Sequence, residues 1–147
     1  MASGNGDGFG DSPQGGFAAG ASLDVYEAVY RLVMTAYGYR CALTGEQFAP
    51  DIGLVHPHLE VVAIRPRDAG GPLAIDNYLA LEEHAARAFR AGQFIIEDDY
   101  RVVLPVAGAL APAIRPHASG HLLVPDEPLF KPNPAHLAFH RKKVLGR

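Results

Sequence analysis

The segment 59–92 constrains the fold more than any other part of the chain. It contains, in order, an apolar run of strand length, a Gly/Pro loop, an Asp-Asn turn, a second short apolar run and a helical segment closed by glycine: Leu59–Ile64, Arg65–Ile75, Asp76-Asn77, Tyr78–Leu81 and Glu82–Gly92. The glycines and proline of the loop exclude a helix or a central strand there. The segment therefore predicts two short strands, joined by a loop and followed by one helix.

The flanking segments predict further helices and a hairpin. Asp24 and Glu27 have capping-box spacing, and apolar residues recur at helical intervals from Asp24 to Tyr37. Two apolar runs on either side of an acidic turn predict a hairpin over 94–104. Asn133 followed by Pro134 predicts the start of a C-terminal helix. Short strands are expected over 39–46 and 120–125, which completes an α+β chain.

Composition bounds the organisation and the setting of the chain. With 147 residues and 48% apolar content, one domain over 23–147 is expected, after a flexible Gly-rich tail over 1–22. The single cysteine, Cys41, excludes an intrachain disulfide and is expected to be a small buried apolar side chain. The sequence contains no apolar run of the roughly 18 residues that a membrane span requires. A cytoplasmic protein is expected, with no membrane association.

Four segments in order resemble the HNH endonuclease family, in its bacterial restriction-type branch: Tyr37–Gly45, Leu59–Pro66, Asp76–Leu81 and Ala88–Gly92. The closing part of the chain also resembles that branch, so that the resemblance covers about residues 24 to 147. It implies a ββα-metal, HNH-like core with an N-terminal helix, an extra hairpin and a C-terminal helix.

The resemblance also assigns the positions of the reaction. In that family a strand histidine is the general base, an asparagine holds its loop, and a histidine and an aspartate on the helix bind one divalent ion. These roles fall on Ala63, Asn77, Ala86 and Arg90. A methyl group neither takes a proton nor binds a metal ion, and a guanidinium repels one. The resemblance thus implies a vestigial site without metal, cofactor or catalytic residues.

Two functions follow from this pattern. The first is a catalytically inactive HNH-nuclease-like module that associates with nucleic acid or acts as a protein-binding scaffold, with Arg90 neutralising a phosphate at the vacated site. The alternative is an active DNA endonuclease with displaced groups and one divalent ion such as Mg²⁺. Its base would be His56 or His58, and its ligands would come from four residues near the core: Asp76, Glu82, Glu83 and His84.

Nucleic-acid contacts beyond Arg90 are expected from Arg65 and from three residues of the C-terminal basic cluster, Arg141, Lys142 and Lys143. The cluster also includes His140 and Arg147. The formal net charge of −3 provides no global attraction to phosphate, so these residues would have to form a local patch. Basic residues in a last helical turn also complement the helix dipole, which is an alternative role for the cluster. DNA and a protein partner both remain open, and so does the oligomeric state.

Overall fold

The computed structural model describes residues 19–51, 53 and 55–146. Residues 1–18, which form most of the expected Gly-rich tail, lie outside the described part of the chain. Among the described residues, none of the helices combines the length and the apolar character needed to cross a lipid bilayer.

Segment 59–92 forms a two-stranded antiparallel sheet followed directly by a helix. Strand β1 (Leu59–Ala63) pairs with β2 (Tyr78–Glu82), with Leu59 opposite Glu82 and Ala63 opposite Tyr78. Helix α2 (Glu83–Arg90) begins where β2 ends, because the Glu82 side chain accepts a hydrogen bond of 2.7 Å from the backbone N–H of Ala85. The expected order of strand, loop, strand and helix is therefore observed.

The N-terminal helix starts earlier than expected. Helix α1 (Ala19–Ala36) begins five residues before Asp24, so the Asp24–Glu27 pair lies inside the helix and does not form a capping box. The apolar residues that recur at helical intervals are only partly buried. Val25 and Leu32 are exposed, whereas Val29 and three further residues are buried: Val33, Met34 and Tyr37. The helix buries this face because it packs against both strands of the β1–β2 sheet.

The remaining elements confirm the hairpin and the last helix but correct the two outer strands. Strands β3 (Ile95–Ile96) and β4 (Val102–Val103) pair antiparallel, and helix α3 (Pro134–Leu145) begins at the Asn133 cap. The expected strands over 39–46 and 120–125 are reduced to isolated bridges, Arg40 with Gln47 and Arg101 with His121. Turns leave too few consecutive residues for a ladder: the N–H of Gly45 bonds to the carbonyl of Cys41, and that of Gly120 to His117.

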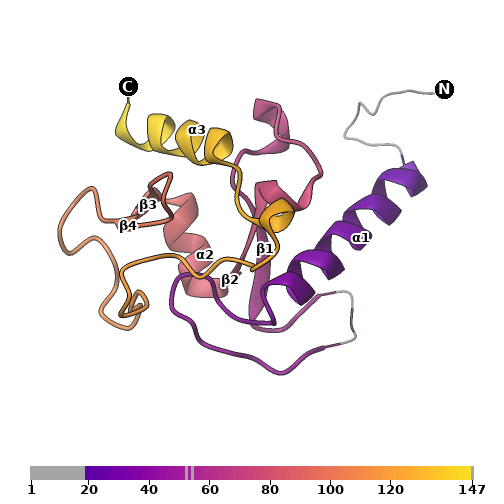
Figure 1. Ribbon diagram of the computed structural model, residues 1–147, viewed down its shortest axis with the longest axis horizontal. Coiled ribbons are helices and arrows are strands. Elements are labelled where there is room, and N and C mark those ends of the chain that lie inside the picture. Colours follow the sequence, from indigo (N-terminus) through magenta and orange to yellow (C-terminus); the bar gives the residue numbers. More distant parts are fainter. Residues whose placement is uncertain (1–18, 52, 54, 147) are drawn as a thin grey trace.

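Figure 1 shows the β1–β2 sheet between α1 and α2, with α3 above the β3–β4 hairpin. The core lies where these elements meet, and its largest fully buried side chains include Phe89, Phe94 and Met34. Cys41 is fully buried in this core, as the sequence predicted. This packing leaves the end of β1, the end of α2 and one face of α3 around a common space.

Candidate functional site

The loop that follows β1 is held by one buried amide. Asn77, which is fully buried, accepts a hydrogen bond from the backbone N–H of Arg65 (2.9 Å). Its Nδ2 donates to the carbonyls of Arg65 (2.9 Å) and Pro72 (3.1 Å). Both donors of the amide and one acceptor position of its oxygen are thus used on backbone groups of the loop. Asn77 fixes the path of the chain immediately after Ala63.

Gly71 lies against the same hydrogen bonds between Asn77 and the loop. A Cβ atom at this position would lie 1.7 Å from the carbonyl oxygen of Arg65 and 2.9 Å from Nδ2 of Asn77. Glycine is required here because two backbone segments approach each other too closely for any side chain. The Gly/Pro loop is therefore a compact element that positions the end of β1.

A cavity of about 490 Å³ lies between this loop, the end of α2 and α3. Its lining combines apolar side chains with three basic or imidazole side chains, those of Arg90, His140 and Lys143. The lining residues are Ala63, Ile64, Pro66, Phe89, Arg90, Ala91, Gly92, Phe139, His140, Lys143 and Val144. None of these lining residues carries a carboxylate. In a chain of net charge −3, this local composition favours an anionic ligand.

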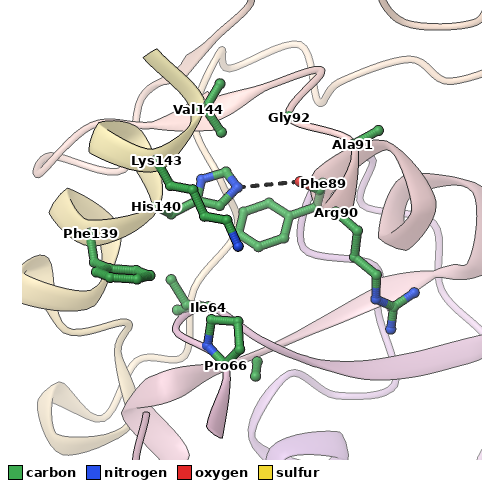
Figure 2. A pocket seen from close by; sticks show the side chains of 11 residues that line it. Ile64, Pro66, Phe89, Arg90, Ala91, Gly92, Phe139, His140, Lys143 and Val144 are labelled. Atoms are coloured by element: carbon green, nitrogen blue, oxygen red, sulfur yellow. Dashed lines mark hydrogen bonds between the residues drawn. The ribbon is translucent and has the colours of Figure 1, made fainter. Parts of the chain in front are cut away.

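The two cations of the cavity have different surroundings. Figure 2 shows the Lys143 ammonium directed from α3 into the cavity, whereas the Arg90 guanidinium is turned away from its centre. Arg90 donates to Oε1 of Glu60 on β1 at 2.9 Å. Lys143 forms no ion pair with any described residue. Lys143, rather than Arg90, therefore supplies the cation inside the cavity.

A third cation lies beside the cavity. The guanidinium carbon of Arg65 is 4.7 Å from the centre of the Phe139 ring, and its Nε donates to the carbonyl of Ala69 at 2.8 Å. Stacking on an aromatic face orients a guanidinium without neutralising it. Phe139 and Arg65 thus form one edge of the cavity that is both aromatic and positive.

His140 forms the back wall. Its ring stacks on Phe89 with centres 3.9 Å apart, and its Nε2 donates to the carbonyl of Phe89 at 3.2 Å. Burial lowers the pKa of His140 below its ordinary value, and the charges of Lys143 and Arg141 lower it further, against the opposing effect of the Phe89 carbonyl. A neutral imidazole at neutral pH is therefore part of the packing between α2 and α3.

The structure brings to this cavity two of the four positions that the HNH resemblance assigns to the reaction. Ala63 and Arg90 line it. Ala86 is fully buried in the core and does not reach the cavity. Asn77 does not line the cavity either, but it holds the loop after β1 by its hydrogen bond with the N–H of Arg65. The Arg90 guanidinium does not fill the space between them, because Glu60 holds it.

The expected basic patch is also only partly formed. Arg141 donates to the carbonyl of Ile96 (2.8 Å) and to Asp98 (2.9 Å), so its guanidinium ties α3 to the β3–β4 hairpin. Lys142 is exposed but does not line the cavity. Of the C-terminal basic cluster, Lys143 is the residue that the fold directs to the candidate site.

The three histidines of the alternative function occupy other places. His56 is buried, with Nε2 donating to the Ala49 carbonyl (2.9 Å) and Nδ1 accepting from two backbone N–H groups, so that neither nitrogen is available to a water molecule. His58 stacks on Phe48 with ring centres 5.7 Å apart. His84 is exposed on α2 and contacts Glu82 at 3.1 Å.

The acidic residues of the alternative function do not gather into a metal site. Within the described residues, no three side chains of His, Cys, Asp or Glu lie close enough together to hold a metal ion. Asp76 instead accepts a hydrogen bond from Asn133 at 3.3 Å. Burial would raise the pKa of Glu82, but hydrogen bonds from His84 and Ala85 lower it overall, as expected for a helix cap.

Comparison with known proteins relates this chain to a solved structure. No family model and no curated protein matches the sequence. A solved structure does match, with a TM-score of 0.61 and 29% sequence identity over 79% of this chain. That structure is a modification-dependent TagI restriction endonuclease. The fold is thus similar to part of a restriction endonuclease.

The two chains differ in length. The match covers 37% of the restriction endonuclease, so this chain corresponds to little more than a third of that protein. The similarity supports a nuclease-like, mixed α/β fold with three helices and small antiparallel sheets. It does not extend the activity of the whole restriction endonuclease to this chain.

Sequence reasoning missed two residues of the site, Glu60 and Phe139. Phe139, His140, Lys143 and Val144 recur at intervals of three and four along the last helix, so they share one face of it. That spacing could have indicated a mixed aromatic and basic face. Nothing local in the sequence pairs Glu60 with Arg90, which are 30 residues apart.

Proposed function

We propose that this chain is an HNH-nuclease-like domain that binds nucleic acid through the cavity at the end of β1 and does not hydrolyse it. Support comes from the restriction endonuclease similarity and from the ββα order of β1, β2 and α2. The resemblance to the HNH family assigns the base and two metal ligands to Ala63, Ala86 and Arg90. None of these side chains performs either role.

The observation that carries the proposal is the composition of the cavity. A metal-dependent nuclease requires carboxylates or imidazoles that face the phosphate, and the lining residues supply one imidazole that is stacked and buried. They supply Lys143 instead, whose ammonium is directed into the space. A fixed cation can neutralise a phosphate without activating water.

A matched pair of variants tests this function. We expect the wild-type protein to bind nucleic acid at low salt, with an affinity that falls as salt rises. Lys143→Gln should lower the slope of log Kd against log salt by about one, because one phosphate contact is lost. Lys142→Gln removes the same charge from an exposed neighbour outside the cavity and should leave the slope nearly unchanged.

A second assay addresses hydrolysis. Supercoiled plasmid is incubated with the protein and with Mg²⁺, Mn²⁺, Ni²⁺ or Zn²⁺, and intact plasmid is expected in each case. Metal-dependent nicking that disappears in Asn77→Ala would show an active nuclease and overturn the proposal. Absence of any nucleic-acid binding at low salt would also overturn it, and a protein-binding role would then take its place.

A further inference from the structure

The cavity offers apolar surface as well as cations. Besides its cations, the cavity exposes carbon surface from both of its sides, with Ile64 and Pro66 from the loop and Phe139 and Val144 from α3. A paired duplex presents mainly phosphates and sugars to such a site, because its bases are stacked inside. An unpaired nucleotide presents a flat, apolar base together with a phosphate.

We propose that the cavity accepts a single unpaired nucleotide of a nucleic-acid strand, with its base against Phe139 and Pro66 and its phosphate on Lys143. This inference rests on the proposed function and narrows it to single-stranded nucleic acid. The volume of about 490 Å³ lies within the roughly 300–1,000 Å³ range of small-ligand sites. A cavity of this size holds one nucleotide unit but no base pair with its backbones.

Phe139 is the side chain in the cavity best suited to contact a base. Phe89 also lines the cavity, but it is buried and its ring face is already covered by His140 at 3.9 Å. Phe139 is half-buried and does not belong to the core cluster or to the side chains packed against it. The Arg65 guanidinium lies over one face of this ring at 4.7 Å, so the base would contact the opposite face, with positive charge next to it.

The position of Glu60 agrees with a preference for single-stranded over double-stranded nucleic acid. Its pairing with Arg90 removes one cation from the mouth of the cavity and adds a carboxylate at the surface of β1. A duplex, which brings two strands of phosphates to the surface, meets this carboxylate. A single nucleotide that enters the cavity meets Lys143 and the apolar walls instead.

The test compares one labelled oligonucleotide as a single strand and as a duplex, by fluorescence anisotropy at low salt with the full chain. We expect the single strand to bind about tenfold more tightly than the duplex. Phe139→Ala should weaken single-strand binding about tenfold, which is within the range measured for base–aromatic contacts, and should change duplex binding little. Phe139→Tyr keeps an aromatic face and should retain the wild-type preference.

The outcomes separate the two proposals. Equal affinity for the single strand and the duplex, unaffected by Phe139→Ala, would overturn the single-nucleotide inference and leave the nucleic-acid-binding function standing. Failure of the wild-type protein to bind either form would overturn both. A thermal melt of Phe139→Ala close to that of wild type establishes that its weaker binding does not come from unfolding.

Discussion

The Arg90 guanidinium on α2 and the Glu60 carboxylate on β1 form an ion pair of 2.9 Å that links the helix to the strand beside the cavity. Both side chains are accessible to solvent, Arg90 more than Glu60, so the pair adds little to stability, about 1 kcal/mol at most. Its larger effect is electrostatic, since it holds Arg90 away from the space that Lys143 enters.

Removal of the Glu60 charge tests this effect. Glu60→Gln frees Arg90 and deletes a negative charge beside the cavity, and we expect nucleic-acid affinity at low salt to rise about threefold. Glu27→Gln is the matched control, because Glu27 forms an ion pair of similar length, 3.0 Å, with Arg31 on α1. An affinity unchanged by Glu60→Gln, or raised equally by Glu27→Gln, would contradict the role given to the pair.

Asn77 should contribute strongly to stability. Asn77→Ala leaves the N–H of Arg65 and the carbonyls of Arg65 and Pro72 without their partners, and buried groups of this kind cost about 1–3 kcal/mol each. We expect urea denaturation to show a loss of roughly 3 kcal/mol in the free energy of unfolding. A loss below about 0.5 kcal/mol, the range of ordinary surface substitutions, would show that the loop is held by other contacts.

A substitution at Gly71 tests the close packing of the same loop. In Gly71→Ala the new Cβ would overlap the Arg65 carbonyl, and the backbone must move, at a cost of about 3 kcal/mol or more. The control is Gly108→Ala, where the Cβ meets open space and only the positive φ of 78° is unfavourable, at about 1 kcal/mol. Thermal melts of the two variants should therefore differ clearly, and equal melting temperatures would contradict the close approach.

Ala63 and Ala86, two positions that the HNH resemblance assigns to the reaction, should tolerate histidine differently. Ala86 is fully buried in the core, so Ala86→His should destabilise the fold by about 1–3 kcal/mol through overpacking. Ala63 lines the cavity, and Ala63→His can extend into it at less than about 1 kcal/mol. Urea denaturation of both variants measures the difference, and an equal cost would show that the space beside Ala86 opens more easily than the packing indicates.

The neutral, buried state of His140 predicts a pH dependence of stability. Because its pKa is lowered in the folded protein, the unfolded chain binds more protons below the ordinary value of about 6.5, and stability falls as the pH drops through that range. His140→Gln should reduce the fall in melting temperature between pH 7.5 and 5.5. The control is His58→Gln, which removes an exposed imidazole. This variant should show the same fall in melting temperature as the wild-type protein. The stabilising effect of the lowered Glu82 pKa is lost only at more acidic pH, below its ordinary value of 4.5.

The sequence predicted the elements whose signals are local. The alternation of apolar runs with Gly/Pro and Asp-Asn turns placed β1, β2 and α2, and the Asn133-Pro134 pair placed the start of α3. It failed where pairing depends on distant segments, as in the expected strands over 39–46 and 120–125. It also failed at the start of α1. The helix begins at Ala19, so Asp24, which suggested a cap, lies inside it.

The sequence by itself determined the residue types at Ala63, Ala86 and Arg90, the positions to which the resemblance to the HNH family assigns the base and the metal ligands. The tertiary structure decided which side chains lie around these positions. The packing of α3 against the end of α2 brings Lys143 and Phe139 to Ala63, about 80 residues away in the chain, and the β1–α2 contact pairs Arg90 with Glu60. Such contacts depend on how helices pack, which local patterns of residues do not encode.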